Sequence, residues 1–306
     1  MDRYARDDFD LPPTLNSGIA HVLLTKSAHH AWWKHPRLRP GWQPDGARSF
    51  DLGTAAHAAL LEGKPLHVVQ IVDEKTGELV SPTDYKKKAT QKARDEAKAA
   101  GKFPVLADQA PDVAAMITSA RAKLAASPDL AGLGPLFAEQ TAVWEHGGTW
   151  LRCRPDWMTA GHDTVISYKT TRASAEPSAF LRTALGMGYD MQAAFELAGV
   201  KAVTGVDAAY VWLVGEVAPP FACSLVGMTG EHRAFAGMRF RQAVAAWAHC
   251  LAADSWPAYS DHIERPELPA WAQAQFIERH GYQPEHVEDD PDQPIEEAMF
   301  AKGEMP

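Results

Sequence analysis

The stretch DTVISYKTT, residues 163–171, decides the fold, because it predicts a β-strand that carries polar and charged side chains on one face. β-Branched and aromatic residues dominate it, as is typical of strands. Side chains alternate along a strand, so Ser167 and Lys169 point to the same face of the predicted sheet. The preceding segment TWLRCRPDWM (149–158) also predicts a strand, and Asp156 ends it. If the two strands pair, Asp156 approaches the face that carries Ser167 and Lys169.

The segments around this stretch predict further strands and helices. EQTAVWEH (139–146) and residues 149–158 read as a hairpin, because Gly147 and Gly148 join them. More strands are expected over residues 207–215 and 221–228. Helical periodicity and end signals predict helices over residues 14–34, 49–63, 81–102, 112–128, 177–199 and 229–252. We therefore expect one α/β (α+β) domain over residues 1–284, with a central mixed β-sheet flanked by helices and with N-terminal helical elaborations.

The charge of the chain is concentrated at its C-terminal end. The net charge of the 306 residues is −9; residues 285–306 carry −7 of it, which leaves −2 for residues 1–284. An acidic tail of this kind is expected to be disordered. A near-neutral body is compatible with a nucleic-acid partner, and the lysine-rich helix expected over residues 81–102 either tracks phosphates or presents a solvated face.

Other classes of protein are disfavoured by what the sequence lacks. No run of about 18 apolar residues is present, so no membrane span is expected. The N-terminal segment contains no apolar stretch, so we expect no secretory signal. The three cysteines are far apart and form no CxxC pair, which excludes a zinc knuckle or an iron–sulphur site. A cytoplasmic location in a reducing compartment fits these features.

Four short motifs carry a family resemblance. They are GTAAH (53–57), RPD (154–156), SYKTT (167–171) and YDMQAAF (189–195), in this order on an expected helix, strand, strand and helix. Together they resemble the PDDEXK nuclease superfamily, and within it the exodeoxyribonuclease VIII or RecE-like branch of phages and prophages. The resemblance covers about residues 50–215 and implies a restriction-endonuclease-like core.

The resemblance also assigns roles to individual residues. It implies that His57 and Asp156 hold a divalent cation, Mg²⁺ or Mn²⁺, and that the backbone carbonyl of Tyr168 adds a ligand. Lys169 would position the attacking water or offset the charge that develops on the phosphate. Magnesium chemistry suits phosphodiester hydrolysis, because hard cations bind carboxylate oxygens and activate water. Two helical residues would steady the site and the DNA strand: Tyr189 and Gln192.

Ser167 departs from the pattern of the superfamily, which has Asp or Glu two residues before the lysine. A neutral hydroxyl is a poor metal ligand, and its presence leaves Lys169 without a counter-charge. Asp163 lies ~13 Å along the strand, too far to replace the missing acid. Glu139 or Glu145, on the preceding strand, remains an alternative source. We favour an engineered, inactivated form of the enzyme over a natural pseudo-nuclease that binds DNA ends.

The function implied by the resemblance is metal-dependent resection of linear double-stranded DNA, in the 5′ to 3′ direction. The product would be single strands for a RecT-like annealing recombinase, in the cytoplasm of a bacterium or phage-infected host. The resemblance further implies a homo-oligomer, a tetrameric ring that binds DNA ends. Two other interpretations stay open: a catalytically silent scaffold that binds DNA ends, and a protein-interaction module that docks through the acidic tail.

Overall fold

A computed structural model describes residues 11–42, 52–61, 63, 65–73 and 75–280 of the chain. The internal contacts divide the chain into two units, Met1–Tyr259 and Ser260–Pro306. In the second unit the described residues contain one helix, α9 (Ala270–His280). The expected domain boundary at residue 284 and the acidic tail, residues 285–306, lie outside the described residues.

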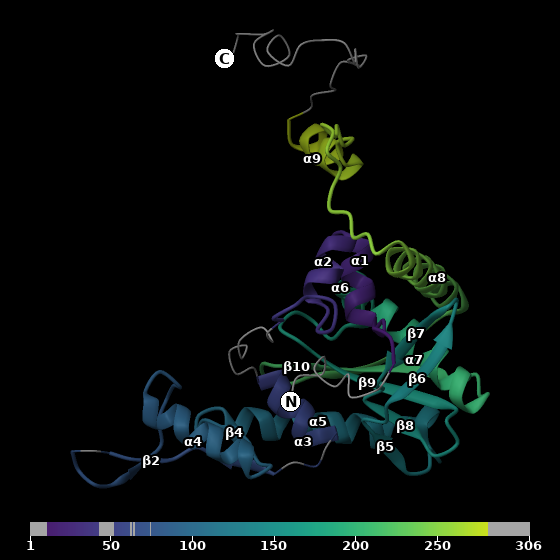
Figure 1. Cartoon of the computed structure of the whole chain (residues 1–306). Helices are drawn as coiled ribbons and strands as arrows, with labels where there is room; N and C mark the ends of the chain where they lie inside the picture. The colour runs from purple at the N-terminus through teal and green to yellow at the C-terminus, as the bar shows by residue number, and fades with distance from the viewer. Residues whose placement is uncertain (1–10, 43–51, 62, 64, 74, 281–306) are drawn as a thin grey trace. The chain divides into compact units, whose positions relative to one another are not determined.

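A five-stranded mixed sheet forms the centre of the first unit, as the sequence predicts (Figure 1). Its strands are β5 (Leu136–Ala138), β8 (Trp157–Thr159), β9 (Thr164–Thr171), β10 (Ala209–Glu216) and β11 (Cys223–Gly227). Their order is β11-β10-β9-β8-β5, in which only β9 and β10 are parallel. The predicted hairpin is also present, formed by β6 (Ala142–His146) and β7 (Thr149–Cys153). The strand expected over residues 149–158 is thus divided, since β8 belongs to the central sheet.

The connection between the parallel strands contains two helices rather than one. A single helix was expected over residues 177–199, but the structure has α6 (Pro177–Met187) and α7 (Tyr189–Thr204). The break occurs at Gly188, whose φ of 73° lies in the left-handed region that favours glycine. As a result Tyr189 begins α7, and Gln192 lies in its first turn.

The N-terminal helices also differ from the prediction in their bounds. The helix expected over residues 14–34 is two helices, α1 (Ser17–Thr25) and α2 (Ala28–Lys34), because the Ser27 side chain caps the second one. The helix expected from residue 81 begins later, as α4 (Lys88–Ala99). The expected helices near residues 49–63 and 112–128 are present as α3 (Leu52–Leu61) and α5 (Ala110–Ala126). The prediction missed five short strands, one 3-10 turn and one helix: β1 (Leu66–Val68), β2 (Ile71–Val72), β3 (Leu79–Val80), β4 (Phe103–Val105), β5 (Leu136–Ala138), Pro128–Leu130 and α9 (Ala270–His280).

Helices cover both faces of the sheet, and alternating residues of β9 belong to the two layers. Ile166 and Tyr168 pack with α3 and α5 in one apolar cluster, whereas Val165 packs with α6 and α7 in another. Figure 1 shows α3 and α5 on one side of the sheet and α6 and α8 (Gly230–Ala253) on the other. Within the described residues, no helix is both long and apolar enough to cross a bilayer.

Candidate active site

Asp156 lies at the centre of the site, immediately before β8. The antiparallel register pairs Trp157 with Ile166, so continuing it by one residue places Asp156 opposite Ser167. The Ser167 hydroxyl donates to Asp156 Oδ2 at 2.8 Å, and the Tyr168 N–H donates to the same oxygen at 3.0 Å. Asp156 is fully buried. Hydrogen bonds to an ionised carboxylate are among the stronger ones in proteins, so this arrangement fixes the orientation of the Asp156 carboxylate.

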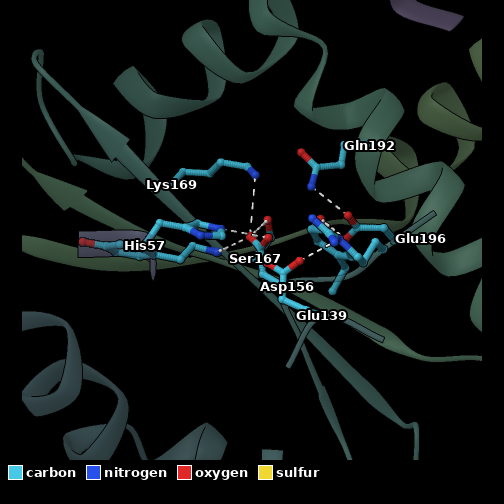
Figure 2. A network of polar contacts seen from close by, with 10 residues as sticks. His57, Glu139, Asp156, Ser167, Lys169, Gln192 and Glu196 are labelled. Carbon is cyan, nitrogen blue, oxygen red and sulfur yellow. Dashed lines mark hydrogen bonds and ion pairs between the residues drawn. The ribbon is translucent and has the colours of Figure 1, made fainter. Parts of the chain in front are cut away.

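His57 reaches the same carboxylate from helix α3. Its Nε2 lies 3.1 Å from Asp156 Oδ1 (Figure 2). The His57 ring also stacks near that of Tyr168. The approach of α3 to β9 depends on Gly53, one turn before His57. A Cβ atom at position 53 would overlap the Thr170 hydroxyl. The small residue therefore lets the helix lie close enough to the strand for the imidazole to meet Asp156.

Glu139 completes a group of three side chains that offer metal-ligand atoms. One such atom from each of His57, Glu139 and Asp156 lies within 4.8 Å of the others. Glu139 follows β5, and its backbone N–H donates to the Asp156 carbonyl at 3.1 Å. Its φ of 58° is uncommon for a residue with a side chain. Arg154, from the RPD motif, holds the Glu139 carboxylate at 2.6 Å. Of the two alternatives for an extra acid, the structure thus brings Glu139 to the site, whereas Glu145 lies exposed on the β6–β7 hairpin.

Lys169 lies on the face of β9 that α7 covers. Its Nζ is 3.8 Å from Asp156 Oδ2 and 4.9 Å from the centre of the Tyr189 ring. Only about a tenth of its side chain is exposed. An ammonium held between a carboxylate and an aromatic face keeps its charge near the site and its position restricted. The structure therefore brings five predicted residues together: His57, Asp156, Ser167, Lys169 and Tyr189.

Gln192 has a partner that the sequence analysis did not identify. Its Nε2 donates to Glu196 Oε1 at 2.7 Å, one turn along α7 (Figure 2). The other oxygen of Glu196 accepts a hydrogen bond of 2.8 Å from the Tyr210 hydroxyl of β10. Glu196 is 2% exposed. Burial, and next the charge of Asp156, raise the pKa of Glu196 to about 7, although Lys169 and the two hydrogen bonds act in the opposite direction.

Asp163 is not part of the site, as its distance along β9 predicted. Its carboxylate instead accepts a hydrogen bond from Thr159 at 2.5 Å, across the turn between β8 and β9. The carbonyl of Tyr168 stays a predicted ligand, because Tyr168 contacts Asp156 through its backbone N–H. A signal for Glu196 was present in the sequence: it lies four residues after Gln192, and such residues share a helix face.

The donor set fits a hard divalent cation. Two carboxylates and one imidazole suit Mn²⁺ and Mg²⁺ better than a thiolate-binding metal, and the free cysteines lie elsewhere. The His57 and Glu139 side chains are partly exposed, at 17% and 16%, whereas Asp156 is buried. A cation would thus meet solvent, and a substrate, on the side of His57 and Glu139.

Comparisons with known proteins agree with this fold. A family model described as a PDDEXK-like domain of unknown function (DUF3799) matches residues 24–268. The structure is similar to that of a candidate exonuclease from Eubacterium rectale, with a TM-score of 0.52 and 10% identity over 85% of this chain and 92% of that one. Comparison with a phage-related exonuclease from Haemophilus somnus 129PT gives a TM-score of 0.27 and 12% identity, over 68% of this chain and 97% of that one.

No curated protein matches the chain. The family model nevertheless covers well over half of the 306 residues, and the central mixed sheet with helices on both faces is the fold expected of it. The chain therefore belongs to the PDDEXK-like family DUF3799, within the PDDEXK nuclease superfamily.

Proposed function

We propose that the protein is a metal-dependent exodeoxyribonuclease that digests linear double-stranded DNA from its ends. The observation that carries this proposal is the convergence of three possible metal ligands, His57, Glu139 and Asp156, with the restricted ammonium of Lys169. A bound Mg²⁺ or Mn²⁺ would neutralise charge on the scissile phosphate and lower the pKa of a coordinated water. The similarity of the fold to that of a candidate exonuclease supports action on DNA ends.

The side chains have distinct roles in this proposal. His57, Glu139 and Asp156 hold the cation, while the hydroxyl of Ser167 and the N–H of Tyr168 fix the orientation of Asp156. Lys169 donates hydrogen bonds to the attacking water or to a phosphate oxygen, which stabilises the negative charge of the transition state. Tyr189 and Gln192 keep the site in place from α7, Tyr189 against Lys169 and Gln192 through Glu196.

The expectation that Ser167 inactivates the chain depended on a missing anion beside Lys169. Two other carboxylates lie at or near the site, those of Glu139 and Glu196. This favours an active enzyme over an inactivated form. The two interpretations predict opposite results for Ser167→Asp: activity increases if the serine impairs the site, and does not increase if another carboxylate already supplies the charge.

The finer features of the proposal follow the RecE-like resemblance. They are digestion in the 5′ to 3′ direction, delivery of single strands to a RecT-like annealing recombinase, and assembly as a homo-oligomeric ring, of which a tetramer is one form. Helix α4 exposes several lysines that can contact DNA phosphates, although the same residues suit a solvated face: Lys88, Lys92 and Lys98.

The test is digestion of linear and closed circular duplex DNA, each labelled at known positions, with Mg²⁺ or with EDTA. We expect Mg²⁺-dependent loss of the linear substrate alone, with 5′ labels released first, and no digestion by Asp156→Asn. Equal cleavage of both substrates would contradict an exonuclease. Binding of DNA ends without digestion by the wild type and by Ser167→Asp would instead favour a catalytically silent scaffold.

A further inference from the structure

We infer that Glu196, on helix α7, carries the second catalytic-site carboxylate whose place in the β9 motif is taken by Ser167. This inference rests on the proposed function, because it concerns the same cation and the same lysine. It assigns to one site a carboxylate that comes from a helix instead of the strand.

The first support is the position of Glu196 relative to the motif. Ser167 and Lys169 point to the face of β9 that α7 covers, and α7 places Glu196 on that face. Two hydroxyls, those of Tyr210 and Ser167, link the carboxylates of Glu196 and Asp156. The Tyr210 hydroxyl donates to Glu196, the Ser167 side chain interacts with Tyr210, and the Ser167 hydroxyl donates to Asp156.

The second support is the burial of Glu196. A carboxylate that is 2% exposed loses most of its hydration, which is unfavourable unless the surroundings compensate. An apolar residue at this position would avoid the loss of hydration, but it would leave the Gln192 amide and the Tyr210 hydroxyl without this acceptor. Gln192 and Tyr210 instead bind one oxygen each, so both oxygens are held in fixed positions. A buried, oriented acid near Asp156 and Lys169 has the properties of a functional group.

The third support is the small size of Ser167. Ser167 is fully buried, in contact with Asp156 and close to Tyr210. A longer acidic side chain at position 167 would have to fit beside Asp156 and Tyr210, and Tyr210 already binds the Glu196 carboxylate. Two carboxylates confined there would repel one another, so an acid at 167 and an acid at 196 are alternatives.

In this arrangement Glu196 does two things that an acid at position 167 would do. Asp156 already pairs with Lys169, so it alone would have to balance both the ammonium and a cation. Once ionised, Glu196 adds a second negative charge near Lys169 and adds attraction for a divalent cation at the His57, Glu139 and Asp156 cluster. Ser167 and Tyr210 transmit its position to Asp156. Glu196 is thus a positioning and charge-bearing residue, whereas the cluster holds the cation.

The test is an exchange of carboxylates, followed by two measurements. Glu196→Gln, Ser167→Asp and the double variant are compared with the wild type and with Glu231→Gln, an exposed control on α8. Mn²⁺ binding is measured by calorimetry without DNA, and digestion of linear duplex DNA is measured with Mg²⁺. Thermal denaturation confirms that each variant is folded. The amide of Glu196→Gln keeps one acceptor for Gln192, so the fold is expected to survive.

We expect Glu196→Gln to lose about 10-fold or more in Mn²⁺ affinity, with a parallel loss of digestion. The double variant recovers most of both, because the carboxylate returns through position 167. Ser167→Asp alone gives no gain, since the two acids repel one another. Glu231→Gln behaves as the wild type.

Two further outcomes separate this inference from the proposed function. Unchanged Mn²⁺ affinity in Glu196→Gln, or failure of the double variant to exceed Glu196→Gln, would overturn the inference even if the wild type digests DNA. Loss and recovery of Mn²⁺ binding with no digestion by any variant would support the relocated carboxylate and overturn the nuclease.

Discussion

The titration of Glu196 makes the stability of the metal-free protein depend on pH in a specific way. The pKa of this carboxyl rises from 4.5 to about 7 in the folded protein. Between these two values the native state keeps the proton while the unfolded state loses it. The free energy of unfolding therefore falls as the pH rises from about 4.5 to 7, and is constant on either side as far as this group is concerned.

The size of the effect follows from the shift in pKa. Each unit corresponds to about 1.4 kcal/mol, so the shift contributes a loss of about 3 kcal/mol between pH 4.5 and pH 8. Other groups titrate in the same range, and comparison with Glu196→Gln removes their contribution. The neutral amide accepts from Gln192 and donates to Tyr210 at all these pH values. We therefore expect the variant to gain about 3 kcal/mol on the wild type between pH 5 and pH 8.

The assay is urea denaturation in EDTA at pH 5, 6, 7 and 8, with the free energy of unfolding taken from each curve. Glu231→Gln is the matched control, because the same substitution on an exposed position leaves the pH dependence unchanged. If the curves of free energy against pH for the wild type and for Glu196→Gln run parallel, Glu196 does not hold a proton in the folded state, and our account of its burial is wrong.

Four further predictions concern the site. Gly53→Ala introduces a Cβ against the Thr170 hydroxyl, so we expect the free energy of unfolding, measured by denaturation, to fall by about 1–3 kcal/mol. We also expect weaker Mn²⁺ binding, measured by calorimetry. Adding Thr170→Ala to the same chain should restore both the stability and the Mn²⁺ affinity. Glu139→Asn should stay within about 1 kcal/mol of the wild type in stability, because asparagine tolerates a positive φ, while Mn²⁺ affinity falls about 10-fold; equal affinity would remove Glu139 from the site. Lys169→Gln should slow digestion by about 10³-fold without weakening Mn²⁺ binding, since it removes a positive charge; weaker Mn²⁺ binding would contradict its role in the transition state. Binding of Mn²⁺ at pH 6 should release up to about one more proton from the wild type than from Glu196→Gln, as calorimetry in buffers of different ionisation enthalpy can measure. Equal release from the two proteins would show that the cation does not act on Glu196.

The sequence predicted the part of the site that depends on local pattern. The alternation along residues 163–171 placed Ser167 and Lys169 on one face, and the register of β8 and β9 brings Asp156 to Ser167 as expected. His57 was expected on the helix that carries it, α3. These inferences succeeded because the periodicity of a strand or helix determines the face to which each of its side chains points, without information from the rest of the chain.

The sequence did not predict features that depend on the path of the backbone between elements. Helical periodicity continues through residues 177–199, so the left-handed residue Gly188 was not recognised as the end of α6. Glu139 and Glu145 were both left open as the extra acid, and the choice between them depends on the positive φ of Glu139 after β5, which strand periodicity does not predict. Glu196 was overlooked although it lies one helical turn after Gln192, because its second partner, Tyr210, belongs to a strand 14 residues away.

The charges of the site explain how a carboxylate on helix α7, that of Glu196, can act in place of one at position 167 on strand β9. Arg154 pairs with Glu139 and Lys169 with Asp156, so these four groups together carry no net charge. A divalent cation would enter a neutral, partly buried place, where its own hydration is lost without compensation. An ionised Glu196 makes the local charge negative, and its raised pKa lets it stay neutral until a cation arrives. The acid can therefore act from α7, because electrostatic attraction in a poorly solvated site does not require direct ligation of the cation.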